Sequence, residues 1–282
     1  MTSDMPEPAA SPDASSLRSD RVDVAGVAFD GLRQADVVAL VEQGWSSGQG
    51  GLILTPNVDI WRLADRDAEI ADLVAGAEVV VADGQPLVWA SRLSGRPLPE
   101  RVTGSGLVEA LCASAARQGE RVFIVGGGGE DTAERAATAL RARYAGLEVA
   151  GHVVPPFGFE RDATAYAALR AQIIEADPRL VLVGLGFPKQ ERLAGELRTA
   201  LPAAWFLGCG GGVAMAAGIQ SRSPAWAQRL GVEWVFRMVQ EPRRLGRRYL
   251  VDDVPAAIRL LARSAWTPVR RRLARAIGRS GT

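Results

Sequence analysis

The sequence predicts an α/β protein, in which a mainly parallel sheet carries helices on both faces and is followed by a basic helical appendage. Short, almost wholly apolar runs recur at the spacing of βα units, and helix-length segments rich in Ala, Leu, Arg and Glu lie between them. Strands of a parallel sheet are covered on both faces, so they form continuous apolar runs. After residue 220 the pattern changes to short helical segments in which arginine recurs among apolar residues.

Six apolar runs are the expected strands. In chain order they are Gly51–Leu54, Glu78–Val81, Arg121–Val125, Leu147–Val149, Leu180–Val183 and Ala204–Leu207. The expected helices are Ile60–Val74, one from Gln85, Leu107–Gln118, Asp131–Tyr144, Asp162–Ala176, Pro224–Leu230, Glu233–Gln240 and Val254–Ala265. This order predicts a disordered leader over residues 1–20, an α/β core over 21–220, a helical appendage over 221–265 and a flexible basic tail over 266–282.

Composition excludes several classes of protein. With 282 residues, 48% of them hydrophobic, the chain can bury a substantial core. No apolar run approaches the roughly 18 residues of a spanning helix, and residues 1–20 lack a signal-peptide pattern, so we expect a cytoplasmic location. Two cysteines and a single histidine are too few for a disulfide scaffold, a cysteine zinc site or histidine-centred catalysis.

Charge is distributed unevenly along the chain. Residues 242–282 contain eleven arginines against two aspartates, whereas the rest holds 22 basic and 30 acidic residues. This basic region indicates an anionic partner, and the arginines at 243–248 suit a helix lying on an anionic membrane surface. A solvated arginine face on a packed helix is the alternative. Nucleic-acid binding is not expected, because no recognition motif or aromatic stacking platform accompanies the arginines.

Glycines follow nearly every expected strand, including Gly126, Gly127 and Gly186. Small turns at the carboxyl ends of parallel strands present backbone N–H groups to phosphates, so a nucleotide or phosphorylated ligand is expected. A nicotinamide-dependent oxidoreductase is an alternative class. It would need an acidic residue at the end of the strand after Gly126, where Gly151 and His152 stand, so the sequence disfavours it.

The turn after Leu180–Val183 contains the only lysine of the chain. Lys189 is followed by Gln190 and Glu191, directly after a glycine turn and Pro188. Because all other basic residues are arginines, this segment indicates a site. An ordinary strand-to-helix turn with Pro188 in the first helical turn is the alternative.

Polar side chains also follow the first two expected strands. Thr55 and Asn57 come after the first, and Asp83 comes after the second, so all three are expected at the ligand crevice. A partly desolvated carboxylate can take a proton from a substrate hydroxyl, and Asp83 is the candidate general base. Asp83 and Asn57 as plain helix caps are the alternative.

Two further motifs precede or interrupt expected helices. Arg101 lies in a loop as a candidate phosphate or carboxylate ligand, with Ser105 as the expected helix cap. Asp65-Arg66-Asp67 has the Asp-x-Asp spacing of metal-dependent transferases, but it falls inside an expected helix. No metal site is therefore expected there.

The motifs as an ordered set resemble the WecG/TagA/CpsF glycosyltransferase family over residues 22–255. They are Thr55-Pro56-Asn57, Asp83-Gly84, Arg101–Gly104, Val125–Gly127, Gly184–Glu191, Arg222–Pro224, Glu233-Trp234 and Glu241–Arg244. The resemblance implies a Rossmann-like core and an inverting, metal-independent transferase without a cofactor. Known members move N-acetylmannosamine, or its uronic acid, from a UDP-sugar to undecaprenyl-diphosphate-linked N-acetylglucosamine in cell-envelope polymer synthesis.

The resemblance also implies roles for individual residues. Asp83 matches the base, Thr55 and Asn57 match residues near the two sugars, Arg101 an active-site arginine and Gln190 a donor-pocket residue. The arginines of the family's appendage, which closes over the site at the membrane, correspond to Arg237, Arg244 and Arg247. The charge on departing UDP would then be met by arginines, Lys189 and glycine-turn N–H groups.

Three departures from the family pattern concern the substrate. Ala214 stands where members often have Asp, Ser223-Pro224 where they have Ala-Pro, and Val58-Asp59 where they have Pro-Glu or Ala-Glu. The donor sugar is therefore left open, and another sugar in exopolysaccharide synthesis is an alternative. We expect peripheral association with the inner face of the cell membrane, and either a monomer or a homo-oligomer.

Overall fold

The computed structural model describes residues 21–221, 233–240 and 246–279. The expected leader over residues 1–20 and the expected helix Pro224–Leu230 lie outside them. The core is a six-stranded sheet in the order β4-β3-β8-β7-β5-β6, and every neighbouring pair is parallel, as expected. The strands are β3 Gly51–Leu54, β4 Val79–Val80, β5 Val122–Val125, β6 Val149–Val153, β7 Leu180–Val183 and β8 Trp205–Gly208.

Both faces of the sheet are buried, which explains the unbroken apolar runs in the sequence. On one face lie α3 Val58–Ala64, α4 Ala68–Ala75, α5 Gln85–Leu93, α8 Ala163–Glu175 and α9 Lys189–Ala200. On the other face lie α2 Gln34–Ser47, α6 Gly104–Gln118, α7 Thr132–Arg143 and α10 Gly212–Ala216. Side chains alternate between the two cores along each strand, as Val181 and Leu182 of β7 do.

At two places in the sheet, the connections that leave adjacent strands run in opposite directions. β5 leads through α7 to β6 at the edge, whereas its neighbour β7 leads through α9 to β8 in the opposite direction. β3 likewise leads to the edge strand β4, whereas its neighbour β8 leads to α10 on the other face. Ligands of open α/β sheets bind at such points, outside the carboxyl ends of the strands. The topology therefore directs attention to the turns after β3, β5, β7 and β8.

Two details of the expected helices were wrong. The expected helix Ile60–Val74 is two helices, because the Asp67 side chain accepts hydrogen bonds from the N–H groups of Glu69 and Ile70 and starts α4. Asp65 to Asp67 thus lie between helices and not within one. In addition, Thr103 caps α6 in place of Ser105, since its hydroxyl accepts from the Gly106 N–H at 3.0 Å.

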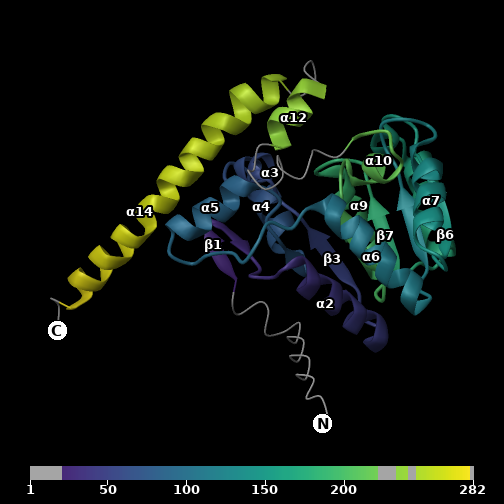
Figure 1. Cartoon of the computed structure of the whole chain (residues 1–282), viewed down its shortest axis with the longest axis horizontal. Helices are drawn as coiled ribbons and strands as arrows, with labels where there is room; N and C mark the ends of the chain where they lie inside the picture. The colour runs from purple at the N-terminus through teal and green to yellow at the C-terminus, as the bar shows by residue number, and fades with distance from the viewer. Residues whose placement is uncertain (1–20, 222–232, 241–245, 280–282) are drawn as a thin grey trace, which may run out of the picture.

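The C-terminal region is helical: α12 spans Glu233–Gln240, the π-helical segment η2 spans Arg248–Asp253 and α14 spans Val254–Arg279. We expected a flexible tail from residue 266, but α14 continues through that point to Arg279. Ala256, Leu260 and Ser264, spaced four residues apart, are buried on one face of α14, which packs on α5. The far end of α14 extends past the body (Figure 1). No helix of the described residues is long and apolar enough to span a membrane.

A small hairpin anchors the start of the described chain. β1 Val22–Val24 pairs antiparallel with β2 Val27–Phe29. The buried Asp30 carboxylate then accepts from the Arg21 guanidinium at 2.8 Å and from the Val80 N–H at 2.7 Å. This pairing ties the hairpin to the end of β4.

Replacement of Gly50 by Ala is expected to destabilise the protein by about 1–3 kcal/mol, because overpacking forces backbone shifts. A Cβ atom on Gly50 would lie 2.1 Å from the carbonyl oxygen of Ala204, at the start of the β3–β8 pair. Gly195→Ala in α9 is the matched control: no atom lies within 4 Å of its added Cβ, and helix propensity predicts a gain of about 0.5–1 kcal/mol. Urea unfolding measures both, and equal effects would contradict the packing argument.

Candidate active site

The carboxyl ends of β3 and β4 open into a cavity of about 300 Å³, hereafter the strand-end cavity. Three residues expected from the sequence, Asn57, Asp83 and Arg101, line it together with Glu233 of α12. α5, η2 and α14 contribute its other walls. Its remaining lining residues are Val58, Gly84, Gln85, Pro86, Trp89, Tyr249, Asp253, Val254, Ala257, Ile258 and Leu261.

Local structure fixes the two polar side chains after the strands. The Asn57 side chain caps α3 by accepting from the Ile60 N–H at 3.0 Å, so Asn57 both caps a helix and faces the cavity. Asp83 does not cap α5, because Gly84 occupies the cap position. Instead the Asp83 carboxylate accepts from the Gly104 N–H, at 3.4 Å, where α6 begins. The positive end of a helix thus faces this carboxylate.

Arg101 joins the core to the C-terminal helices. Its guanidinium lies 2.6 Å from a Glu233 carboxylate oxygen, and both side chains are more than four-fifths buried. Burial opposes the charge of Arg101, but the hydrogen bond and charge of Glu233, with the charge of Asp83, hold its pKa above the ordinary value. A desolvated, permanently charged guanidinium beside Asp83 is suited to bind a diphosphate or carboxylate.

A second group of residues, the glutamine cluster, lies at the ends of β7 and β8. The Gln190 side-chain oxygen accepts from the N–H groups of Gly186, at 3.2 Å, and Gly210, at 3.1 Å. Its amide nitrogen donates to Glu191 at 2.7 Å. Gln190 and Glu191 are 4% and 1% exposed. Gln190 therefore fixes the shape of two glycine turns at once.

Glu191 is buried with incomplete hydrogen bonding. Its Oε2 atom has no hydrogen-bond partner among the described residues. Burial raises the pKa of Glu191 to about 7, against the opposing effects of the Gln190 hydrogen bond and its own backbone N–H. Gly208 makes this placement feasible, because a Cβ there would lie 2.6 Å from a Glu191 oxygen.

The start of α6 lies between the ends of β3, β4 and β8. A Cβ on Gly104 would lie 3.1 Å from the Thr55 hydroxyl and 3.2 Å from the Cα of Cys209. Thr55 of the β3 end and Cys209 of the β8 end therefore meet at the start of α6. Because the Gly104 N–H also reaches Asp83, the ends of β3, β4 and β8 lie around the start of α6.

Lys189 lies at the outer rim of this region. Its ammonium is 2.5 Å from a Glu160 carboxylate oxygen and 6.0 Å from the centre of the Phe157 ring. The Lys189 hydrogen bond and charge lower the pKa of Glu160. Phe157 is fully exposed, which is unusual for a phenylalanine. Sequence reasoning missed Phe157, although the run Val154-Pro155-Pro156-Phe157-Gly158 after β6 marks an irregular loop.

The other residues that the sequence predicted for the site either do not line the strand-end cavity or lie outside the described part of the chain. Gly126 and Gly127 follow β5, and a Cβ on Gly127 would lie 2.7 Å from the Gly184 carbonyl oxygen, so this turn packs against the turn after β7. Neither glycine lines the strand-end cavity. Arg247 is exposed and precedes η2. Arg237 belongs to α12, but its side chain, like all of Arg244, lies outside the described part of the chain.

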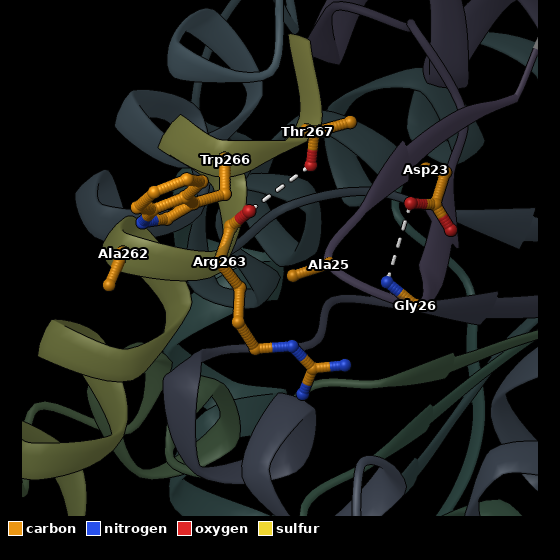
Figure 2. A pocket seen from close by; sticks show the side chains of 7 residues that line it. All are labelled: Asp23, Ala25, Gly26, Ala262, Arg263, Trp266 and Thr267. Carbon is orange, nitrogen blue, oxygen red and sulfur yellow. Dashed lines mark hydrogen bonds between the residues drawn. The ribbon is translucent and has the colours of Figure 1, made fainter. Parts of the chain in front are cut away.

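A second cavity, of about 460 Å³, lies between α14 and the β1–β2 turn (Figure 2). Asp23, Ala25 and Gly26 face Arg263 and Thr267 across it. The Arg263 guanidinium is paired with Asp65 and lies 5.9 Å from the centre of the Trp61 ring. Its charged group is engaged in holding α14 on the body, and we assign no catalytic role to this cavity.

No group of three or more His, Cys, Asp or Glu side chains able to hold a metal is present in the described ranges 21–221, 233–240 and 246–279. Asp65 pairs with Arg263 and Asp67 caps α4, so both carboxylates of the Asp-x-Asp motif have structural partners. The metal-independence of the chemistry stays a prediction.

The chain is similar to a family of known proteins. The model of the Glycosyl transferase WecG/TagA/CpsF family matches residues 22–270. A Bacillus subtilis (strain 168) protein, named N-acetylglucosaminyldiphosphoundecaprenol N-acetyl-beta-D-mannosaminyltransferase, is 30% identical over 195 residues, 69% of this chain and 73% of the relative. A Staphylococcus aureus (strain MW2) protein of the same name is 28% identical over 229 residues, 80% of this chain and 87% of the relative.

The fold and the family match define a glycosyltransferase with a Rossmann-like α/β core. The chain belongs to the WecG/TagA/CpsF family of glycosyl transferases, as its motifs suggested. A carboxylate, Asp83, and an arginine, Arg101, line one cavity at the carboxyl ends of the strands. Sequence reasoning did not assign Glu233 to this site, although Glu233-Trp234 is one of the matching motifs.

Glu191 is expected to make stability depend on pH. In the folded protein Glu191 keeps its proton up to a pKa of about 7, whereas the unfolded chain loses it near 4.5. Stability therefore falls as the pH rises through this window, by roughly 3 kcal/mol. Glu191→Gln, which keeps an oxygen acceptor for Gln190, removes this dependence. Urea unfolding of both proteins between pH 5 and 8 gives the difference, and parallel curves would contradict a raised pKa.

Proposed function

We propose that this chain transfers a sugar from a UDP-sugar to a polyprenyl-diphosphate-linked N-acetylglucosamine acceptor. The observation that carries the proposal is the strand-end cavity, where Asp83 and Arg101 lie together beneath the C-terminal helices. The names of the B. subtilis and S. aureus relatives specify an N-acetyl-beta-D-mannosaminyl group and such an acceptor. N-acetylmannosamine or its uronic acid is accordingly the first candidate sugar, in synthesis of a cell-envelope polymer.

The reaction we propose is a single displacement with inversion. The Asp83 carboxylate takes the proton of an acceptor hydroxyl, and the hydroxyl oxygen bonds to the anomeric carbon of the donor. The bond between that carbon and the UDP oxygen breaks at the same time. Asp83 is suited to this role because it faces the cavity and is held by the Gly104 N–H rather than used as a helix cap.

The leaving UDP carries negative charge that fixed donors must stabilise. The turns after β5, β7 and β8, which hold Gly127, Gly186 and Gly210, come from adjacent strands of the sheet. Gln190 already accepts from the Gly186 and Gly210 N–H groups, so the turn after β5, at Gly127, is the candidate to offer N–H groups to the diphosphate. Lys189, the only lysine of the chain, is a candidate to stabilise this charge. Phe157, near Lys189, offers an exposed ring for stacking on a base. We assign the donor to this side and the acceptor to the strand-end cavity.

The first test measures UDP release from a panel of UDP-sugars, with and without the acceptor, in the presence of a chelator. Asp83→Asn is expected to lower acceptor-dependent release about 10²- to 10⁴-fold and to leave UDP-sugar binding largely intact. Asp67→Asn is the matched control, because Asn caps a helix as well as Asp does. An active Asp83→Asn enzyme would contradict the assignment of the base, and loss of activity with chelator would contradict the metal-free reaction.

The basic C-terminal region supports peripheral binding to an anionic membrane, where a polyprenyl acceptor resides. We expect the change of Arg270, Arg271 and Arg272 to Gln to weaken binding to anionic vesicles by up to roughly a hundredfold, at about 1 kcal/mol per arginine. Changing Arg135, Arg170 and Arg192 of the body to Gln alters the net charge equally and is the control. Vesicle sedimentation measures both, and equal losses would contradict a role of α14.

A further inference from the structure

We infer that the apolar side of the strand-end cavity binds the first isoprene units of the acceptor lipid, an assignment that rests on the proposed function. The cavity is two-sided. Its polar side carries Asn57, Asp83, Arg101 and Glu233. Its apolar side is formed by α5 and α14 through Pro86, Trp89, Val254, Ala257, Ile258 and Leu261.

Several side chains of this apolar side are exposed to solvent, as those of a ligand-binding surface are. Ile258 is 63% exposed, Trp89 41% and Val254 36%, although all three line one cavity. Single exposed apolar residues are common, but a group of them around a concave site marks a binding surface. The group is contributed by two helices that pack on each other, so its shape is fixed by the fold.

The connection to the polar side identifies the ligand. Pro86 and Trp89 follow Asp83 by three and six residues on the same turn and helix. A polyprenyl-diphosphate sugar has the same arrangement, because its hydrocarbon is bonded directly to the diphosphate. With the sugar hydroxyl at Asp83 and the diphosphate near Arg101, the first carbons of the lipid must leave along the α5–α14 wall. A second copy of the chain or a protein partner would not need an apolar wall that adjoins the polar side of the cavity.

The test compares two soluble acceptors, N-acetylglucosamine diphosphate carrying an ethyl or a geranyl group, without membranes or detergent. Each buried methylene favours binding about fourfold, so the wild-type protein is expected to use the geranyl acceptor at least about tenfold more efficiently in kcat/KM. The absence of membranes removes any contribution of the basic region to lipid binding.

Ile258→Asn is expected to lower the geranyl-to-ethyl ratio about tenfold, because it places an amide in the apolar wall. Val251→Asn is the matched control: Val251 is 62% exposed, lies one turn of chain before α14 and does not line the cavity. It is expected to keep the wild-type ratio. Trp89→Ala tests the same wall from α5 and should also lower the ratio, and thermal melts confirm that each variant is folded.

The outcomes separate this inference from the proposed function. Transfer to both acceptors with equal efficiency, or equal effects of Ile258→Asn and Val251→Asn, would overturn the lipid assignment and leave the transferase intact. Sedimentation as a dimer that Ile258→Asn dissociates would also overturn it, in favour of a second copy. No transfer to either acceptor from any UDP-sugar would overturn both.

Discussion

The site depends on the pairing of β3 with β8, the first and last strands of the sheet. About 150 residues of chain separate them, yet Gly51 pairs with Trp205 and Ile53 with Leu207. Gly50 and Gly51 allow the contact, since a Cβ on either would lie within 3 Å of Ala204 or Trp205. This pairing brings Thr55 to Cys209 and unites the turns after β3 and β8. Without it, Asp83 and the glutamine cluster would belong to separate halves of the molecule.

A second constraint follows at the ends of the strands, where polar groups must be buried. Gln190 satisfies the backbone N–H groups of two glycine turns, and Glu191 accepts from Gln190 but leaves one oxygen without a partner among the described residues. A raised pKa is the physical result, because a buried carboxyl with few donors favours its neutral form. The cluster therefore supports the turns after β7 and β8, and the protein is expected to be most stable when Glu191 is protonated.

Sequence reasoning predicted the parallel sheet for a definite reason, although β6 spans Val149–Val153 and not the expected Leu147–Val149. Apolar runs such as Leu180–Val183 are diagnostic because a parallel sheet is buried on both faces. Asn57 and Asp83 were predicted to face a cavity because polar groups gather at strand ends, whereas Arg101 was predicted as a ligand from its loop before α6. The sequence did not reveal the break at Asp67, since a cap inside an amphipathic pattern leaves the hydrophobic period unchanged. Nor did it reveal that α14 continues to Arg279, because an arginine-rich segment is compatible with both a helix and a flexible tail.

The apolar wall and the Arg101–Glu233 pair could be recognised only from the tertiary structure. Glu233 lies 132 residues from Arg101, and only the placement of α12 brings them to 2.6 Å. Trp89 and Ile258 are ordinary apolar residues in the sequence. Only the packing of α5 against α14 shows that both side chains stay exposed. The core thus supplies the groups that can handle a proton and a diphosphate, whereas the C-terminal helices supply one charge partner and a hydrocarbon surface. Such a division suits the acceptor that we propose, half sugar diphosphate and half lipid, because a site between the core and the C-terminal helices can contact both halves.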